Sequence, residues 1–298
     1  MFPDASRSGT VPFGAWQTWY RVTGDLESGA IPLVVLHGGP GAAHDYLLSL
    51  AELSRTGRPV IHYDQVGCGR STHRRDSAAQ DWTVRLFLDE LANLLEALRV
   101  DRYHLLGQSW GGMLAAEHAV ERPVGLASLI LSNSPASIDL WVAEALRLRR
   151  DLPRDVREVL DRHEADGSLD DPAYQEATQA FYDRHVCRVI PNPPEVLAMT
   201  AQLADDPTVY RSMWGPNEFY GTGSLRTWSI IDRLDRIVAP TLLASGRFDE
   251  ATPATVQPFF DRIEDVRWEI FEASSHMPFV EEPLRYLDVI GRFLAEHD

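Results

Sequence analysis

Ser109 lies in the segment GQSWG at 107–111, which fits the pattern G-x-S-x-G. A serine hydroxyl attacks a carbonyl only when a base takes its proton, and this pattern indicates such acyl-transfer chemistry where a strand precedes it and a helix follows. Here the apolar run YHLL at 103–106 precedes the serine, and a helical pattern at 110–121 follows it. The spacing therefore predicts that Ser109 is the nucleophile of a hydrolase.

The acid and the histidine that would activate this serine are predicted from their order along the chain. Hydrolases with this serine pattern have the order serine, acid, histidine. Asp249 follows the apolar run 240–245, and His276 follows the run 267–271. The carboxylate would hold the imidazole in the correct tautomer, and the imidazole would accept the serine proton. We therefore predict Ser109, Asp249 and His276 as a catalytic triad.

Other acids and histidines are disfavoured by position. Asp232 and Asp235 precede the run at 240–245 and are expected to be surface charges, and His297 lies in the C-terminal tail. The histidines that precede or surround the predicted nucleophile, or lie between it and the acid, are expected to be structural or solvated. They are His37, His62, His73, His104, His118, His163 and His185.

Acyl transfer also needs an oxyanion hole, in which two backbone N–H groups point at the oxygen that becomes charged. One N–H should come from Trp110, the residue after the nucleophile. The other should come from HGGPG at 37–41, which follows the apolar run 31–36, because glycines let the backbone approach a substrate without a Cβ. Gly39 is favoured for this role, and Gly38 remains the alternative.

These residues need a scaffold that brings the ends of several strands together. Short apolar runs followed by glycine or polar residues are typical of buried strands in a mostly parallel sheet. Six such runs span 31–36, 59–63, 103–106, 126–131, 240–245 and 267–271, and helical patterns span 83–98, 110–121 and 284–295. This alternation predicts an α/β fold with a doubly wound, mostly parallel sheet.

The alternation stops between 136 and 225. This stretch is rich in charged and helix-forming residues, it has loop signals at DGSLDDP and PNPP, and it contains no strand-like run. Because it separates two strands of the predicted sheet, it would lie over the carboxyl edge where the triad is expected. We predict a helical cap at 136–225 on a core made of 1–135 and 226–298.

Composition excludes several other classes of protein. The 298 residues carry 28 Lys and Arg against 44 Asp and Glu, a net charge of −16, which argues against a nucleic-acid partner. No apolar run approaches the ~20 residues of a membrane span, and the N-terminus does not resemble a signal peptide. Cys68 and Cys187 are the only cysteines, so a cytoplasmic location without a disulfide framework is expected.

Metal and cofactor motifs are also missing from the sequence. There is no H-E-x-x-H, no paired-cysteine motif and no dinucleotide fingerprint. We therefore expect no metal and no cofactor.

Five motifs together extend these predictions. They are HGGPG (37–41), DQVGCGRS (64–71), GQSWGG (107–112), GRFDE (246–250) and SSHMPF (274–279). In this order, and over nearly the whole chain, they resemble the proline iminopeptidase family of α/β-hydrolases. Val66 stands where that family commonly has Arg, and Gln108 where proline-strict members often have Gly. The chain is in this respect more similar to the broader branch with the tricorn-interacting aminopeptidase and the bacterial L-amino acid amidases.

The resemblance implies an acidic site for the free amine of the substrate. The segment WGPNEF at 214–219 matches the family, so Glu218 would hold the amine together with Glu250. An ammonium group beside partly buried carboxylates gains charge-assisted hydrogen bonds. The aromatic residues Trp214, Phe219 and Tyr220 could line the side-chain pocket or belong to the core of the cap.

The predicted function is hydrolysis by a serine aminopeptidase or amidase. It would release an N-terminal proline or another small or hydrophobic residue from short peptides, amino acid amides or arylamides through an acyl-enzyme. The alternative enzyme is a carboxylesterase or lactonase that uses the same triad without recognising an amine. The non-enzymatic alternative is a ligand receptor with a hydrolase fold, against which the complete triad argues.

Overall fold

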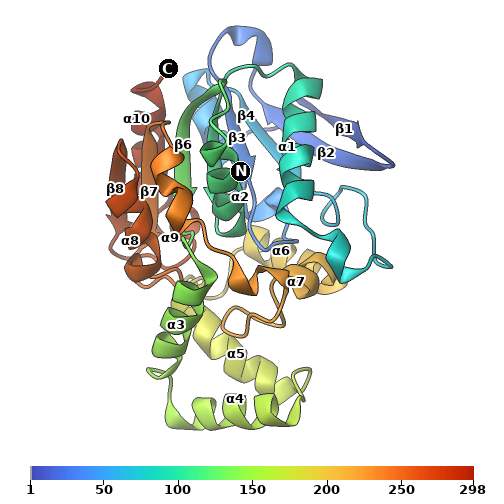
Figure 1. The fold of residues 1–298 in the computed structure, drawn as a ribbon, viewed down its shortest axis with the longest axis vertical. Coiled ribbons are helices and arrows are strands. Elements are labelled where there is room, and N and C mark those ends of the chain that lie inside the picture. Colours follow the sequence, from blue (N-terminus) through green and yellow to red (C-terminus); the bar gives the residue numbers. More distant parts are fainter. Residues whose placement is uncertain (1) are drawn as a thin grey trace.

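Eight strands form one sheet in the computed structural model, which describes residues 2–298 (Figure 1). Their order across the sheet is β1-β2-β4-β3-β5-β6-β7-β8. The strands are β1 Arg7–Phe13, β2 Trp16–Thr23, β3 Leu33–Leu36, β4 Val60–Asp64, β5 Tyr103–Gln108, β6 Leu126–Ser132, β7 Thr241–Gly246 and β8 Val266–Phe271. Strands β3 to β8 pair in parallel and correspond to the six predicted runs. The predicted α/β-hydrolase architecture is confirmed.

The sequence pattern did not predict the antiparallel hairpin of β1 and β2. Strand β2 pairs antiparallel with β4 and joins the hairpin to the parallel strands. The β1 sequence RSGTVPF is mostly exposed, with Val11 as its one buried residue. A strand with so few buried side chains lacks the continuous apolar run that identifies a covered parallel strand.

Both faces of the sheet are covered at its centre, which explains why the central strands are mostly apolar. Along β3, Val34 and Leu36 join one core cluster, and Leu33 and Val35 join the other. Alternate side chains of a strand point to opposite faces, so a strand covered on both sides, such as β3, has a nearly continuous run of apolar residues. The first face packs against α1 Val84–Leu98, α2 Trp110–Val120 and α8 Pro253–Arg262, and the second against α10 Pro283–Ala295 and the 3-10 helix His44–Thr56.

The stretch between β6 and β7 forms five α-helices and, in the described chain, no strand of the sheet. These helices are α3 Ile138–Arg149, α4 Arg154–Asp166, α5 Pro172–His185, α6 Pro194–Asp205 and α7 Thr208–Met213. In Figure 1, α3, α4 and α5 project from one end of the sheet. Trp141 of α3 lines the same cavity as Ser109, which directly follows β5. The insertion therefore faces the carboxyl end of the central strands.

None of the helices within residues 2–298 combines the length and the apolar character needed to cross a lipid bilayer.

Candidate active site

Ser109 occupies a sharp turn between β5 and α2. Its backbone has φ 56° and ψ −121°, a left-handed conformation that non-glycine residues rarely adopt. The turn is possible because Gly111 packs directly on β3: a Cβ there would lie 2.2 Å from the carbonyl oxygen of Leu36. Backbone strain of this kind is concentrated at functional sites. The turn leaves Ser109 partly exposed to a cavity, whereas its two neighbours in sequence are buried.

His276 and Asp249 meet in the folded chain. The Nδ1 atom of His276 lies 2.7 Å from Oδ1 of Asp249, and both side chains are buried. The carboxylate accepts the proton on Nδ1, so the Nε2 atom is left free to accept a proton from another group. Asp249 Oδ1 also accepts the backbone N–H of Ala251 at 2.8 Å.

Asn133, which sequence reasoning missed, holds the other oxygen of this carboxylate. Its Nδ2 donates to Asp249 Oδ2 at 2.6 Å and to the backbone carbonyl of Ser275 at 3.3 Å. Asn133 follows the end of β6 and has φ 53°. The polar segment at 132–134, which follows the run at 126–131, was the available signal, because the carboxyl ends of neighbouring parallel strands meet at one edge.

The nucleophile turn and the histidine loop are joined directly. Gln108, the residue before Ser109, donates from Nε2 to the backbone carbonyl of His276 at 3.3 Å. The ring of Trp141 lies 5.9 Å from the His276 ring, and the same indole lines the cavity beside Ser109. The fold thus gathers the three predicted triad residues at one edge of the sheet, from the ends of β5, β7 and β8.

The two predicted oxyanion donors flank the serine. Gly39 and Trp110 line the cavity together with Ser109. Trp110 is the first residue of α2, so its N–H has no acceptor within the helix. The N–H of Gly38 already donates to the hydroxyl of Tyr46 at 2.6 Å. This bond favours Gly39 over Gly38 as the second donor.

Two carboxylates lie beside the histidine. Glu250 is 1 % exposed, and within the described residues its Oε2 atom has no hydrogen-bond partner. Its Oε1 atom lies 3.9 Å from Nε2 of His276. Glu218 lines the cavity with Ser109 and accepts a hydrogen bond from Tyr210 at 2.5 Å. A buried carboxyl oxygen without a partner is costly, and a bound cation would remove that cost.

Burial and mutual repulsion control the protonation of these carboxyls. Burial, the charge of Glu218 and the charge of Asp249 together hold the pKa of Glu250 well above its usual 4.5. Burial also raises the pKa of Glu218, although the hydrogen bond from Tyr210 and the charge of His276 oppose the rise. Burial lowers the pKa of His276, but the charge and hydrogen bond of Asp249 outweigh it, and the net pKa lies above 6.5.

The cavity beside Ser109 is narrow and has aromatic walls. Its volume is about 10 Å³, and its walls include Met113, Trp141 and Trp214. Of the aromatic residues noted in the sequence, Trp214 lines the cavity, whereas Phe219 packs against Phe181 at 5.1 Å between ring centroids. Tyr220 is exposed.

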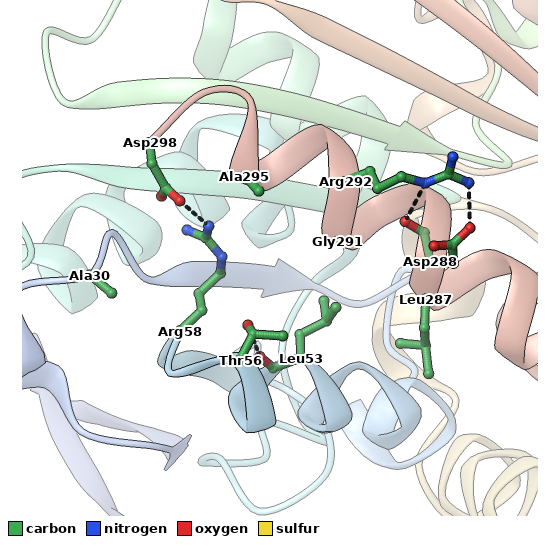
Figure 2. A pocket seen from close by; sticks show the side chains of 10 residues that line it. All are labelled: Ala30, Leu53, Thr56, Arg58, Leu287, Asp288, Gly291, Arg292, Ala295 and Asp298. Carbon is green, nitrogen blue, oxygen red and sulfur yellow. Dashed lines mark hydrogen bonds and ion pairs between the residues drawn. The ribbon is translucent and has the colours of Figure 1, made fainter.

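A larger cavity of about 420 Å³ lies elsewhere, between α10 and the 3-10 helix His44–Thr56 (Figure 2). Its charged side chains are paired: Arg58 with Asp298 at 2.8 Å, and Arg292 with Asp288. None of its lining residues belongs to the predicted site. Over residues 2–298, no group of three or more His, Cys, Asp or Glu residues is arranged to hold a metal ion.

Comparison with known proteins places this architecture in a family. The model of the alpha/beta hydrolase fold family matches residues 31–283. A proline iminopeptidase from Lactobacillus delbrueckii subsp. lactis is 40% identical over 290 residues, which cover 97% of this chain and 98% of the relative. The proline iminopeptidase of Clostridium botulinum is 37% identical over 292 residues, 97% of this chain and 98% of the relative.

Solved structures agree with the sequence relatives. The crystal structure of VinJ is 52% identical, has a TM-score of 0.98 and covers 99% of this chain and 100% of VinJ. The crystal structure of the Mycobacterium smegmatis proline iminopeptidase is 51% identical, with a TM-score of 0.91 and 98% coverage of both chains. The chain belongs to the proline iminopeptidase family of α/β-hydrolases, as its five motifs predicted.

Proposed function

We propose that this chain is a serine aminopeptidase that releases an N-terminal residue, proline or another small or hydrophobic residue, from short peptides, amino acid amides or arylamides. The observation that carries the proposal is a buried carboxyl close to the base His276: the Oε2 atom of Glu250 has no hydrogen-bond partner among residues 2–298. The family relatives that are named proline iminopeptidases support the same reaction.

The triad performs acyl transfer in two halves. His276 accepts the proton of Ser109 as the hydroxyl oxygen attacks the scissile carbonyl, and Asp249 stabilises the imidazolium that forms. The tetrahedral oxyanion accepts hydrogen bonds from the N–H groups of Gly39 and Trp110. The histidine then protonates the leaving amine, and an acyl-enzyme remains. Water, activated by the same histidine, hydrolyses that ester and frees the amino acid.

The position of Glu250 selects an α-amine. In an aminoacyl group the amine nitrogen lies about 2.5 Å from the carbonyl carbon that is attacked. Because Glu250 lies 3.9 Å from the Nε2 atom that serves that carbonyl, an ammonium on the adjacent carbon can reach the carboxylate. Glu218, which lines the cavity beside Ser109, binds the same ammonium. A blocked or internal peptide bond has no ammonium there, so the reaction is confined to N-termini.

The narrow cavity limits the size of the released residue. A volume of about 10 Å³ accommodates about one water molecule, so an aminoacyl group enters as Trp141 and Trp214 move apart. Both indoles come from residues 136–225, which we propose form a cap that shapes the pocket and excludes water from the acyl-enzyme. Small compact residues such as proline require the smallest displacement.

The proposal also covers the setting of the reaction. The substrate is a small peptide or amide, and the strongly acidic chain has no nucleic-acid partner. The free cysteines Cys68 and Cys187 fit a reducing, cytoplasmic environment.

The decisive test compares free and blocked substrates. Prolyl and alanyl arylamides should be cleaved, and their N-acetylated forms should react at least about a hundredfold more slowly in kcat/KM, because two charge-assisted hydrogen bonds of roughly 1.5–3 kcal/mol each are lost. The control is a pair of p-nitrophenyl esters of acetate and propionate, which carry no amine in either form. Equal rates on free and acetylated arylamides would instead support the carboxylesterase or lactonase alternative.

The pH dependence of kcat/KM should distinguish the titration of His276 from the titration of Glu250. His276 must be neutral to act as base, so kcat/KM falls as pH drops through its pKa, which lies above 6.5. For an aminoacyl arylamide, protonation of Glu250 also blocks the amine site, and its pKa is raised as well. We expect the acid limb of log kcat/KM to approach a slope of two for the arylamide and one for p-nitrophenyl acetate. The α-amine, with a pKa near ~8, sets an alkaline limb for the arylamide alone. Identical acid limbs for both substrates would contradict the role of Glu250.

A further inference from the structure

Tyr46 and Gln108 form a continuous hydrogen-bonded bridge beneath the candidate active site. The N–H of Gly38 donates to the Tyr46 hydroxyl at 2.6 Å, and that hydroxyl donates to Oε1 of Gln108 at 2.6 Å. At the other end, Nε2 of Gln108 donates to the carbonyl of His276 at 3.3 Å. The bridge thus joins the loop 37–41, the end of β5 and the loop that carries the histidine.

Each polar atom of the bridge has a defined partner. The Tyr46 hydroxyl accepts one hydrogen bond and donates one, and the Gln108 amide accepts with its oxygen and donates with its nitrogen. Both side chains are at most 2 % exposed, so water cannot replace a lost partner easily. Burial raises the pKa of Tyr46 far above its usual value of 10, so the phenol remains a donor at any working pH.

The bridge also fits tightly against the loop that it supports. A Cβ on Gly38 would lie 2.7 Å from Oε1 of Gln108, 2.8 Å from the Tyr46 hydroxyl and 3.1 Å from Cβ of Ser109. The loop is therefore packed against both bridge residues and against the nucleophile. Movement of either bridge side chain would shift Gly39, the next residue, relative to Ser109.

We propose that Tyr46 and Gln108 are positioning residues that fix the Gly39 N–H of the oxyanion hole relative to Ser109 and to the His276 loop. By holding the Gly38 N–H, Tyr46 orients the following peptide so that Gly39 can donate to the transition-state oxyanion. Gln108 connects Tyr46 to the loop that carries His276. The oxyanion-hole loop and the histidine loop are therefore held in place by the same bridge. The inference rests on the proposed acyl-transfer function and not on amine recognition.

The bridge predicts an effect on kcat and not on substrate binding. An oxyanion donor acts in the transition state, so its displacement lowers kcat and leaves KM nearly unchanged. Removal of a whole donor costs about 10²–10³ in kcat, and misplacement by about 1 Å can cost about 10². For Tyr46→Phe and Gln108→Met we therefore expect kcat to fall roughly 10–100-fold, with KM within about threefold of wild type.

The experiment measures kcat and KM for Tyr46→Phe, Gln108→Met and the double variant, on p-nitrophenyl acetate and on an aminoacyl arylamide. The double variant should lose about as much as one single variant, because each breaks the same bridge. Tyr103→Phe is the matched control: its hydroxyl is also buried with a single side-chain partner, His118, at the opposite end of β5. That control should keep its kcat, and melting temperatures should be compared for all variants.

A transition-state probe separates positioning from general loss of structure. An amino aldehyde forms a tetrahedral adduct when the Ser109 oxygen bonds to its carbonyl carbon and the serine proton moves to His276, whereas the corresponding amino alcohol cannot. The two probes are prolinal, the aldehyde, and prolinol, the alcohol. The bridge variants should bind prolinal more weakly, by the same factor by which their kcat falls. They should bind prolinol with the affinity of wild type.

The proposal would be overturned if the bridge variants lost equal affinity for prolinal and prolinol. It would also be overturned if kcat fell in Tyr103→Phe by as much as in the bridge variants. Strictly additive losses in the double variant would overturn it as well. The measurements on p-nitrophenyl acetate keep this test separate from the proposed aminopeptidase function, because hydrolysis of this ester needs the oxyanion hole but involves no amine. A wild type that cleaves the ester but no aminoacyl arylamide would contradict the aminopeptidase proposal and still test the bridge.

Discussion

Replacement of Ser109 with alanine should lower kcat on an aminoacyl arylamide by roughly 10⁴-fold or more, because the members of a serine triad act as a unit. The serine oxygen would form the acyl-enzyme, and Ser109 is the only residue of GQSWG at 107–111 that has a hydroxyl group. The fold should be retained, since Ala removes one partly exposed oxygen atom. Steady-state kinetics, with circular dichroism and melting temperature as checks, measure this effect.

Ser49→Ala provides the matched control for that prediction. Ser49 is buried in the 3-10 helix His44–Thr56, and its hydroxyl has no hydrogen-bond partner within residues 2–298. The same chemical change there should leave kcat within about twofold of wild type, as for most substitutions away from a special feature. A fluorophosphonate should label wild type and Ser49→Ala stoichiometrically and should not label Ser109→Ala. If Ser109→Ala kept more than about a tenth of the activity, the nucleophile would be another residue.

The second large effect concerns the proposed amine site. Glu250→Gln and Glu218→Gln should each lower kcat/KM on free-amine substrates by about 10–100-fold, because a hydrogen bond to a charged group contributes roughly 1.5–3 kcal/mol. Glutamine nearly preserves the shape of the side chain, so the loss reports the negative charge. Rates on p-nitrophenyl acetate should change far less, since the ester carries no ammonium.

The direction in which Glu218→Gln shifts the pKa of His276 gives an independent check. The charge of Glu218 raises the pKa of His276, so Glu218→Gln should move the acid limb of the ester reaction to lower pH. The matched control is Glu176→Gln, which removes the same charge from an exposed position on α5. Its kcat/KM should match wild type on both substrates. Equal losses on esters and free-amine substrates in Glu250→Gln would mean that the residue supports the triad and not the amine.

If Glu218 and Glu250 bind the ammonium group as proposed, substrate binding should be coupled to proton release. In the free protein, burial and the neighbouring charges of Glu218 and Asp249 hold the pKa of Glu250 well above 4.5. An ammonium that enters the site would favour the ionised form of Glu250, so the pKa of this carboxyl should fall when substrate binds. A site of this kind binds a neutral group poorly, because the desolvated carboxylates would remain unpaired.

Many features of this protein were predictable from short stretches of sequence. A strand covered on both faces has a nearly continuous apolar run, and each of the six parallel strands contains a short apolar run that is followed by glycine or polar residues. The turn at Ser109 needs small residues at fixed offsets, and those offsets are visible in the sequence at 107–111. The family's motifs likewise occupy contiguous segments, so the family and its fold could be predicted without any knowledge of tertiary contacts.

The hairpin of β1 and β2 was not predicted because β1 has no apolar run and the pairing of β2 is long-range. Its side chains are largely exposed on β1, and its place at the edge of the sheet depends on pairing between β2 and β4, which are far apart in sequence. An exposed edge strand needs no apolar run, and its partner cannot be identified from local composition.

Only the tertiary structure determines the hydrogen-bond partners of each predicted site residue. Asn133 reaches Asp249 across 116 positions of sequence, and Tyr46 reaches Gln108 across 62. The choice between Gly38 and Gly39 was open in the sequence because both glycines permit the turn, and it depends on which N–H the Tyr46 hydroxyl occupies. Residue types and local spacing determine which chemistry a chain can carry, because strand, turn and helix preferences act over a few residues. Hydrogen-bond partners, burial and pKa depend on side chains that only the packed fold brings together.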